Sequence, residues 1–121
     1  MAKFKLVKRP ETIAHTVRWK DFDNKDVTLK VEFNYRSRSE FAALMDEGSN
    51  ADLSEDAKLQ EIIMAADSRG AEFLVKALNS WDLEEELNAE NAALLFDQHQ
   101  AAANAIITAY RNLCLEGRLG N

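Results

Sequence analysis

Few side chains in this sequence could do chemistry, and they are scattered along the chain. The 121 residues include two histidines, His15 and His99, and one cysteine, Cys114. None of the three has a second Cys, His or Asp at the spacing of a zinc site. Cys114 falls among apolar positions of a helical pattern and cannot form an internal disulfide, so we expect a buried, inert thiol in a reducing compartment. The sequence therefore predicts no metal, no cofactor and no catalytic residue from these groups.

An acidic series after the first strand-like segment matches the helix-loop-helix calcium loop only in part. Asp21, Asp23 and Glu32 fall at loop positions 1, 3 and 12. Lys25 stands where a ligand is needed, and Asp26 stands where the sharp turn needs glycine. We therefore expect no calcium site. The sequence also shows no glycine-rich phosphate loop and no nucleophile elbow, so it does not predict an enzyme.

Charge is divided unevenly along the chain. Residues 1–38 carry ten Lys or Arg against five acidic residues, a net charge of +5, whereas residues 39–121 carry five against sixteen, a net charge of −11. Such halves attract opposite partners, including each other. Two interpretations follow: the charges balance within one molecule, or copies of the chain associate head to tail.

Alternating residues predict a β-hairpin near the amino end. Apolar and polar residues alternate without interruption over 27–36, and Ile13, Val17 and Trp19 share one face of a second strand over 12–19. Residues 20–26 between them suit a turn. A short edge strand over 3–8 could extend the hairpin, with Pro10 ending it.

The rest of the chain has helical periodicity. Ser37 and Glu40 form a capping box that predicts a helix to Glu47. A second helix is predicted after Ser54, with Leu59, Ile62, Ile63 and Ala66 inward, until Gly70 interrupts it, and a third over 71–80 ends near Trp81. A short helix is capped by Asn88 and has Ala92, Leu95 and Phe96 inward. The last helix covers 100–116 and ends before Gly117. In the first helix Phe41, Leu44 and Met45 are expected to face inward.

The predicted architecture is a single α+β domain over residues 1–121. It consists of an antiparallel β-hairpin or small meander over 1–36, a bundle of four to five helices over 37–116 and a short tail over 117–121. No apolar run approaches the roughly 20 residues that a membrane span needs. The amino end, MAKFKLVKRPE, lacks the apolar centre of a secretory signal, so we expect a cytoplasmic protein.

The basic hairpin is one candidate interaction surface. Its candidate residues are Arg18, Lys20, Lys30 and Arg36. With Trp19 and Tyr35 nearby, these cations could grip phosphates while an aromatic ring stacks on a base. The alternative function is therefore a small regulatory or nucleic-acid-associated domain. Against it, both aromatics fall on the apolar faces of their strands, and a pI near 4.9 opposes affinity for a polyanion.

The second candidate surface is an acidic segment headed by a tryptophan. Its residues are Trp81, Asp82, Leu83, Glu84, Glu85 and Glu86. Trp81 and Leu83 could anchor a partner while the acids keep the surface soluble and orient basic groups. Alternatively, Trp81 ends a helix by packing into the core, and the acids form a solvated loop.

Five short motifs follow one another along the chain: V-x-L-x-V-x-F-x-Y-R over 27–36, S-x-x-E-F over 37–41, an apolar helix with W-D-L and acids over 78–87, an asparagine followed by two leucines over 91–95, and A-I-x-x-A-Y over 105–110. In that order and spacing the chain resembles the tail assembly chaperones of long-tailed bacteriophages, of the lambda-like siphovirus kind. The resemblance spans roughly residues 12–113. Members often have a Pro/Gly-rich hairpin turn, where this chain has DFDNKD, and a proline before the last helix, where it has Gln98-His99-Gln100.

The resemblance implies a non-enzymatic protein of the host bacterial cytoplasm. Such a protein oligomerises, coats the tape measure protein, aids polymerisation of the tail tube and is absent from the mature virion. The resemblance also implies a longer form of the same chain, made by ribosomal frameshifting, through which tail tube subunits are recruited. The acidic segment and the basic hairpin are then the candidate surfaces for protein interactions.

Overall fold

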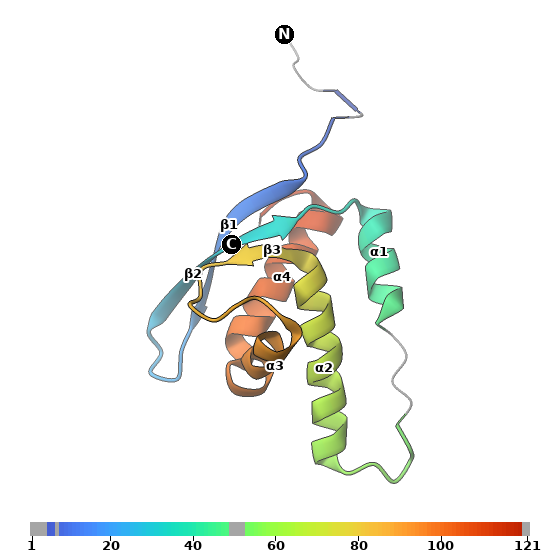
Figure 1. Ribbon diagram of the computed structural model, residues 1–121. Coiled ribbons are helices and arrows are strands. Elements are labelled where there is room, and N and C mark those ends of the chain that lie inside the picture. The colour runs from blue at the N-terminus through green and yellow to red at the C-terminus, as the bar shows by residue number, and fades with distance from the viewer. Residues whose placement is uncertain (1–4, 7, 49–52, 120–121) are drawn as a thin grey trace.

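A three-stranded antiparallel sheet and four helices make up the described part of the chain, in a computed structural model that describes residues 5–6, 8–48 and 53–119 (Figure 1). The elements in chain order are β1 (Thr12–Lys20), β2 (Asp26–Asn34), α1 (Arg38–Glu47), α2 (Leu59–Ala77), β3 (Leu78–Trp81), α3 (Ala89–Gln98) and α4 (Gln100–Glu116). The predicted α+β class is confirmed. The third strand comes from far along the chain, so the sheet is neither a hairpin nor a simple meander.

The predicted hairpin forms with an uninterrupted register from Thr12 opposite Asn34 to Lys20 opposite Asp26. Its turn needs neither proline nor glycine, because the Asp21 carboxylate accepts hydrogen bonds from the amides of Asp23 and Lys25 at 2.9 and 3.0 Å. Of the suggested edge strand over 3–8, residues 3, 4 and 7 lie outside the described residues, and residues 5, 6 and 8 are not in a strand.

Gly70 does not interrupt a helix, contrary to the sequence prediction. α2 runs through it without a break. A Cβ at Gly70 would lie 2.6 Å from the Phe96 ring of α3, so the missing side chain lets the two helices pack closely. The glycine therefore serves helix packing, and its helix-weakening effect of about 1 kcal/mol is offset by the contact it permits.

Residues 78–80, predicted to be helical, form strand β3 instead. Trp81 pairs with Val31, Ser80 with Glu32 and, after a bulge, Leu78 with Phe33. The free edge of β2 offers backbone groups that the end of α2 can satisfy, and Leu78 is buried beneath it. Tertiary pairing has overridden local helical preference here.

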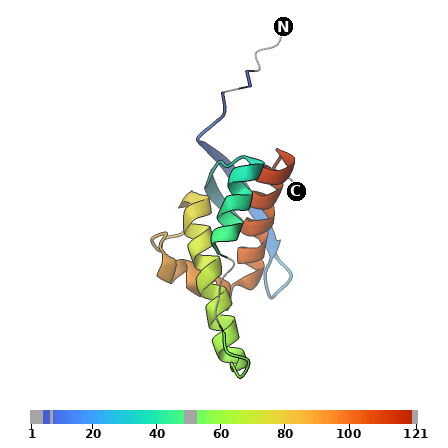
Figure 2. The same cartoon turned by 90° about the vertical axis from the view of Figure 1, so that its right-hand side faces the viewer.

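The helices cover one face of the sheet, and the core lies between them (Figures 1 and 2). Its largest fully buried side chains are Phe33, Leu74, Ile106 and Tyr110. The predicted inward residues of α3, Ala92, Leu95 and Phe96, are buried, as are Phe41 and Leu44 of α1. Met45, which the sequence predicts to face inward, is half exposed.

A partly buried polar junction joins β2, α2 and α4. The Tyr110 hydroxyl donates to the Asn34 carbonyl and accepts from the Arg36 guanidinium, both at 2.8 Å. Arg36 and the Asn34 amide also donate to the Lys76 carbonyl at 2.9 and 3.0 Å. Burial raises the pKa of Tyr110 to about 12, so the hydroxyl stays protonated across the neutral range.

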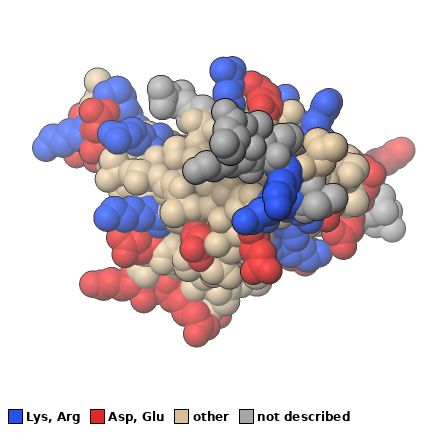
Figure 3. Space-filling model, turned by 90° about the horizontal axis from the view of Figure 1, so that it is seen from above, with Lys and Arg blue, Asp and Glu red and all other residues tan. Residues whose placement is uncertain are grey.

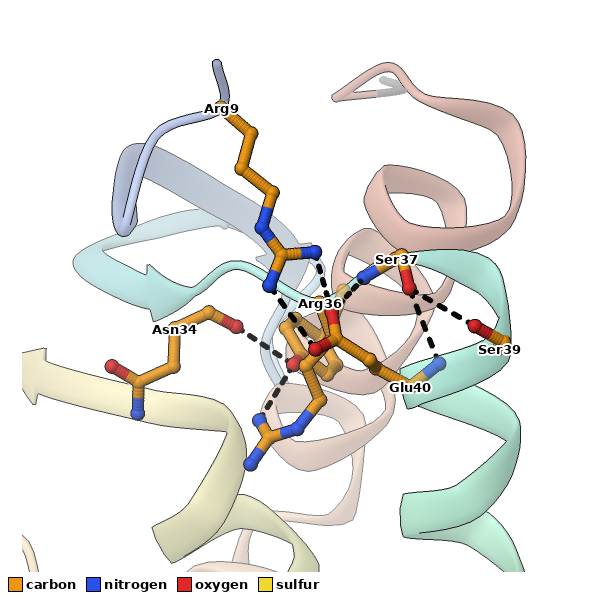
Figure 4. Close-up of polar contacts among 7 residues, drawn as sticks. Arg9, Asn34, Arg36, Ser37, Ser39 and Glu40 are labelled. Atoms are coloured by element: carbon orange, nitrogen blue, oxygen red, sulfur yellow. Dashed lines mark hydrogen bonds and ion pairs between the residues drawn. The ribbon is translucent and has the colours of Figure 1, made fainter. Parts of the chain in front are cut away.

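The amino-terminal segment is fixed to the start of α1 by a charged contact (Figure 4). Arg9 forms a bidentate pair with Glu40, with nitrogen–oxygen distances of 2.6 and 3.1 Å. The predicted capping box is present, because Ser37 and Glu40 exchange backbone-to-side-chain hydrogen bonds. The Arg9 hydrogen bond, followed by that from the Ser37 amide, lowers the pKa of Glu40 to about 2.

We expect Tyr110→Phe to lower the free energy of unfolding by about 1–3 kcal/mol, because it leaves the partly buried Asn34 carbonyl and Arg36 guanidinium without this partner. Tyr35→Phe is the matched control, since Tyr35 is half-buried and its hydroxyl makes no hydrogen bond within the described residues. Urea denaturation measures both variants. Equal stability losses in the two would show that the junction contributes nothing specific.

Gly70→Ala should lower the free energy of unfolding by about 1–2 kcal/mol, because overpacking against the Phe96 ring outweighs the gain in helix propensity. Phe96→Leu in the same chain makes room for the new methyl group. In a double-mutant cycle, the cost of Gly70→Ala should then disappear in the Phe96→Leu background. An unchanged cost would place the strain elsewhere.

Candidate protein-interaction surfaces

Trp81 holds the acidic segment against the body of the molecule. Its side chain is half-buried and packs on the core, and its indole Nε1 donates to the Glu85 carbonyl at 2.8 Å. Leu83 is 38% exposed, and the four acidic residues beside it are exposed. The segment is therefore a closed loop with one outward apolar side chain. A direct contact between Trp81 and a partner stays a prediction.

The four basic candidates do not form one surface. Arg18 and Lys30 are exposed on the outer face of the sheet, where Arg18 lies opposite Thr28 and Lys30 opposite Thr16. Lys20 pairs with Asp26 at 2.8 Å near the turn. Arg36 points inward to the Tyr110 junction (Figure 4). Its guanidinium is therefore engaged within the chain, and a part for it in protein interaction stays a prediction.

The acidic segment begins beside the basic face of the sheet. The Asp82 amide donates to the Lys30 carbonyl at 3.0 Å, which continues the pairing of β3 with β2. In the view from above, most Lys and Arg side chains lie in the upper half of the picture and many Asp and Glu side chains lie along its lower edge (Figure 3). Neighbouring surfaces of opposite charge are consistent with both interpretations of the uneven charge: the charges balance within one molecule, or they attract another copy of the chain.

A third surface is the apolar face in the first half of α2, which is exposed although its helical spacing predicts that it faces the core. Leu59 is 71% exposed, and Ile62 and Ile63 are 44% and 45% exposed. The first half of α2 extends past the other helices, so nothing in the described chain covers it (Figures 1 and 2). Helical spacing identifies an apolar stripe, but it cannot tell whether the stripe is covered by the same chain or by another.

A comparison with protein families decides between the interpretations of the whole chain. A family model described as phage tail assembly chaperone matches residues 1–121. The chain belongs to the phage tail assembly chaperone family. No curated protein and no solved structure matches the sequence.

Two of the three isolated reactive side chains of the chaperone, Cys114 and His15, pack within the fold, and His99 is on the surface. Cys114 is buried in α4, and burial raises the pKa of its thiol. His15 lies beside Phe33 on the inner face of the sheet, and burial, with the charge of Arg18, lowers its pKa. His99 is exposed between α3 and α4. Among the described residues, no cluster of His, Cys, Asp and Glu could hold a metal ion.

The chaperone also has an open groove of about 1070 Å³ between β1 and α4. Its helical wall is formed by small or short polar residues such as Ala101, Asn104, Ala105 and Thr108. His15 is the titratable group of the inner sheet face that lines it. Within the described ranges, no helix is long and apolar enough to cross a membrane.

Reversing charge in the acidic segment tests its part in association. We expect Glu84→Lys with Glu85→Lys to weaken self-association about five- to tenfold at low salt, since each exposed charge contributes up to about 1 kcal/mol. Glu86 is left unchanged because its carboxylate accepts from Asn88, the N-cap of α3. Sedimentation velocity gives the distribution of oligomers.

The matched control for this charge reversal is Glu72→Lys with Glu116→Lys, which changes the net charge equally at two scattered exposed positions. An effect of the same size in the control would mean that only net charge matters. An oligomer distribution unchanged in both variants would remove the acidic segment from the interface.

Proposed function

We propose that this chaperone is a non-enzymatic protein that oligomerises and coats the tape measure protein while the tail tube polymerises around it. The observation that carries this proposal is the family match over the whole sequence. In this proposal the chaperone acts in the host bacterial cytoplasm and leaves before the virion matures.

The described surfaces suit a protein that works in many copies. A coat on a long client needs modest affinity for each copy, so that the coat can be removed when the tube arrives. The exposed cations Arg18 and Lys30 and the exposed acids of residues 82–86 provide charges of both signs for contacts between copies. Such contacts orient and steer partners more than they add affinity.

The proposal includes two further partners. One is a longer form of the same chain, made by ribosomal frameshifting, and the other is the tail tube subunit that this longer form recruits. Both forms would share the fold described above, so the longer form would enter the same coat. Recruitment of tube subunits would then depend on how many long copies the coat contains.

Co-expression of the chaperone with its phage's tape measure protein tests the proposal directly. We expect the chaperone to copurify with a tagged tape measure protein in a stoichiometry well above one, and to form oligomers by sedimentation that shrink at high salt. DNA mobility at about 150 mM salt is the comparison for the alternative function. A chaperone that stays monomeric, ignores the tape measure protein and retards DNA would overturn the proposal.

A further inference from the structure

The uncovered apolar face of α2 continues a face that is buried farther along the same helix. Leu59, Ile62, Ile63 and Ala66 follow the helical spacing that places residues on one side. Gly70, Phe73, Leu74 and Ala77 extend the same side, and they lie in or against the core. One continuous stripe thus runs the length of α2, and only its second half is covered within the described chain.

From this stripe we propose that the first half of α2 is a docking site for an amphipathic helix of the tape measure protein. The inference rests on the proposed function and adds to it the surface and the form of the client. The client helix would lie along Leu59, Ile62 and Ile63 with its own apolar side against them.

The chemistry of the stripe suits a helix as its occupant. The buried half of the same face already packs against helices, since Gly70 is in contact range of Phe96 in α3. Phe73 also meets Phe41 of α1 edge to face, with ring centroids 6.2 Å apart. Residues at this spacing form the ridges that fit the grooves of another helix. An incoming helix would extend packing of the kind that the fold uses downstream.

Two carboxylates specify the charge of the client beside the stripe. Asp67 lies one turn beyond Ile63 in α2, on the flank of the stripe, and burial, together with the charge of Asp97 of α3, raises its pKa. Neither carboxylate has an ion-pair partner within the described ranges. A Lys or Arg on the flank of the client helix would neutralise this pair, so we expect an apolar stripe bordered by basic residues.

A second copy of the chaperone fits this site less well than a long helix does. The uncovered stripe spans about two turns, roughly 11 Å along the axis. A strip of that length and of the roughly 10 Å width of a helix covers on the order of 110 Å². This area is far below the roughly 800 Å² per partner that a stable dimer buries. A long helical client instead contacts many copies along its length, and small contacts then add up. The net charge of −6 on each copy also opposes pairing of like surfaces.

Replacing the stripe with polar residues tests the site. We expect Leu59→Ser with Ile63→Ser to weaken capture of the co-expressed tape measure protein at least tenfold. The melting temperature should change little, because Leu59 is 71% and Ile63 45% exposed, and neither belongs to the core. Met64→Ser is the matched control, since Met64 is 61% exposed on the same helix but away from the stripe. Capture that survives the stripe variant would overturn the site and leave the proposed function standing.

Crosslinking identifies the occupant in the full chain. A photoreactive phenylalanine analogue at position 63 should crosslink to the tape measure protein, and the same analogue at the exposed Ser68 on the opposite side should not. A crosslink to a second chaperone copy, or none, would overturn the proposal. If the unaltered chaperone fails to capture the tape measure protein at all, the proposed function fails as well.

Discussion

The arrangement of the molecule depends on how the last turn of α2 is fixed to the sheet. Asn34 and Arg36 both donate to the Lys76 carbonyl, and Arg36 is itself held by the Tyr110 hydroxyl. The next residues pair with β2 as strand β3. Because a helix is rigid, the position of its amino end is set by its direction at the fixed carboxyl end and by its length. With 19 residues, α2 is about 28 Å long.

This fixed end and this length together explain the exposed stripe. The other helices are shorter than α2, and α3 packs closely against it at Gly70. The first half of α2 therefore extends past them (Figure 2). The same junction uses up Arg36, so the basic face of the sheet is left with Arg18 and Lys30 as its exposed, unpaired cations within the described ranges. This polar junction thus engages Arg36 within the chain and fixes the end of α2, while Arg18 and Lys30 stay exposed.

The sequence predicted those elements that are determined by interactions between residues close together in the chain. The alternation over 27–36, the capping box at Ser37 and the Asn88 cap all gave the elements now observed. The failures arise where distant contacts decide. Gly70 resembles a helix breaker until Phe96 is placed against it, and residues 78–80 resemble a helix end until the free edge of β2 is available.

The interaction surfaces show the same division. The exposure of the acidic residues over 82–86 could be predicted from their charge alone. The inward direction of Arg36 could not, because it depends on Tyr110, which is 74 residues away in the sequence. The α2 stripe was recognised as apolar and assigned to the core, because periodicity reports that a face must be covered and not what covers it. Only the position of α2 relative to the other helices separates these two cases.

The exposed half of α2 also has a consequence for its stability. Its N-cap, Lys58, makes no side-chain capping bond, and its first turns lack the packing that supplies most helical stability in proteins. Good helix formers such as Leu59, Gln60, Glu61 and Met64 sustain the helix there by propensity. Such a segment opens at low free-energy cost and becomes firmer when its face is covered. In the proposed function this property would suit a coat that is removed when the tail tube arrives, because a face that is firm only when covered would bind its client with modest affinity.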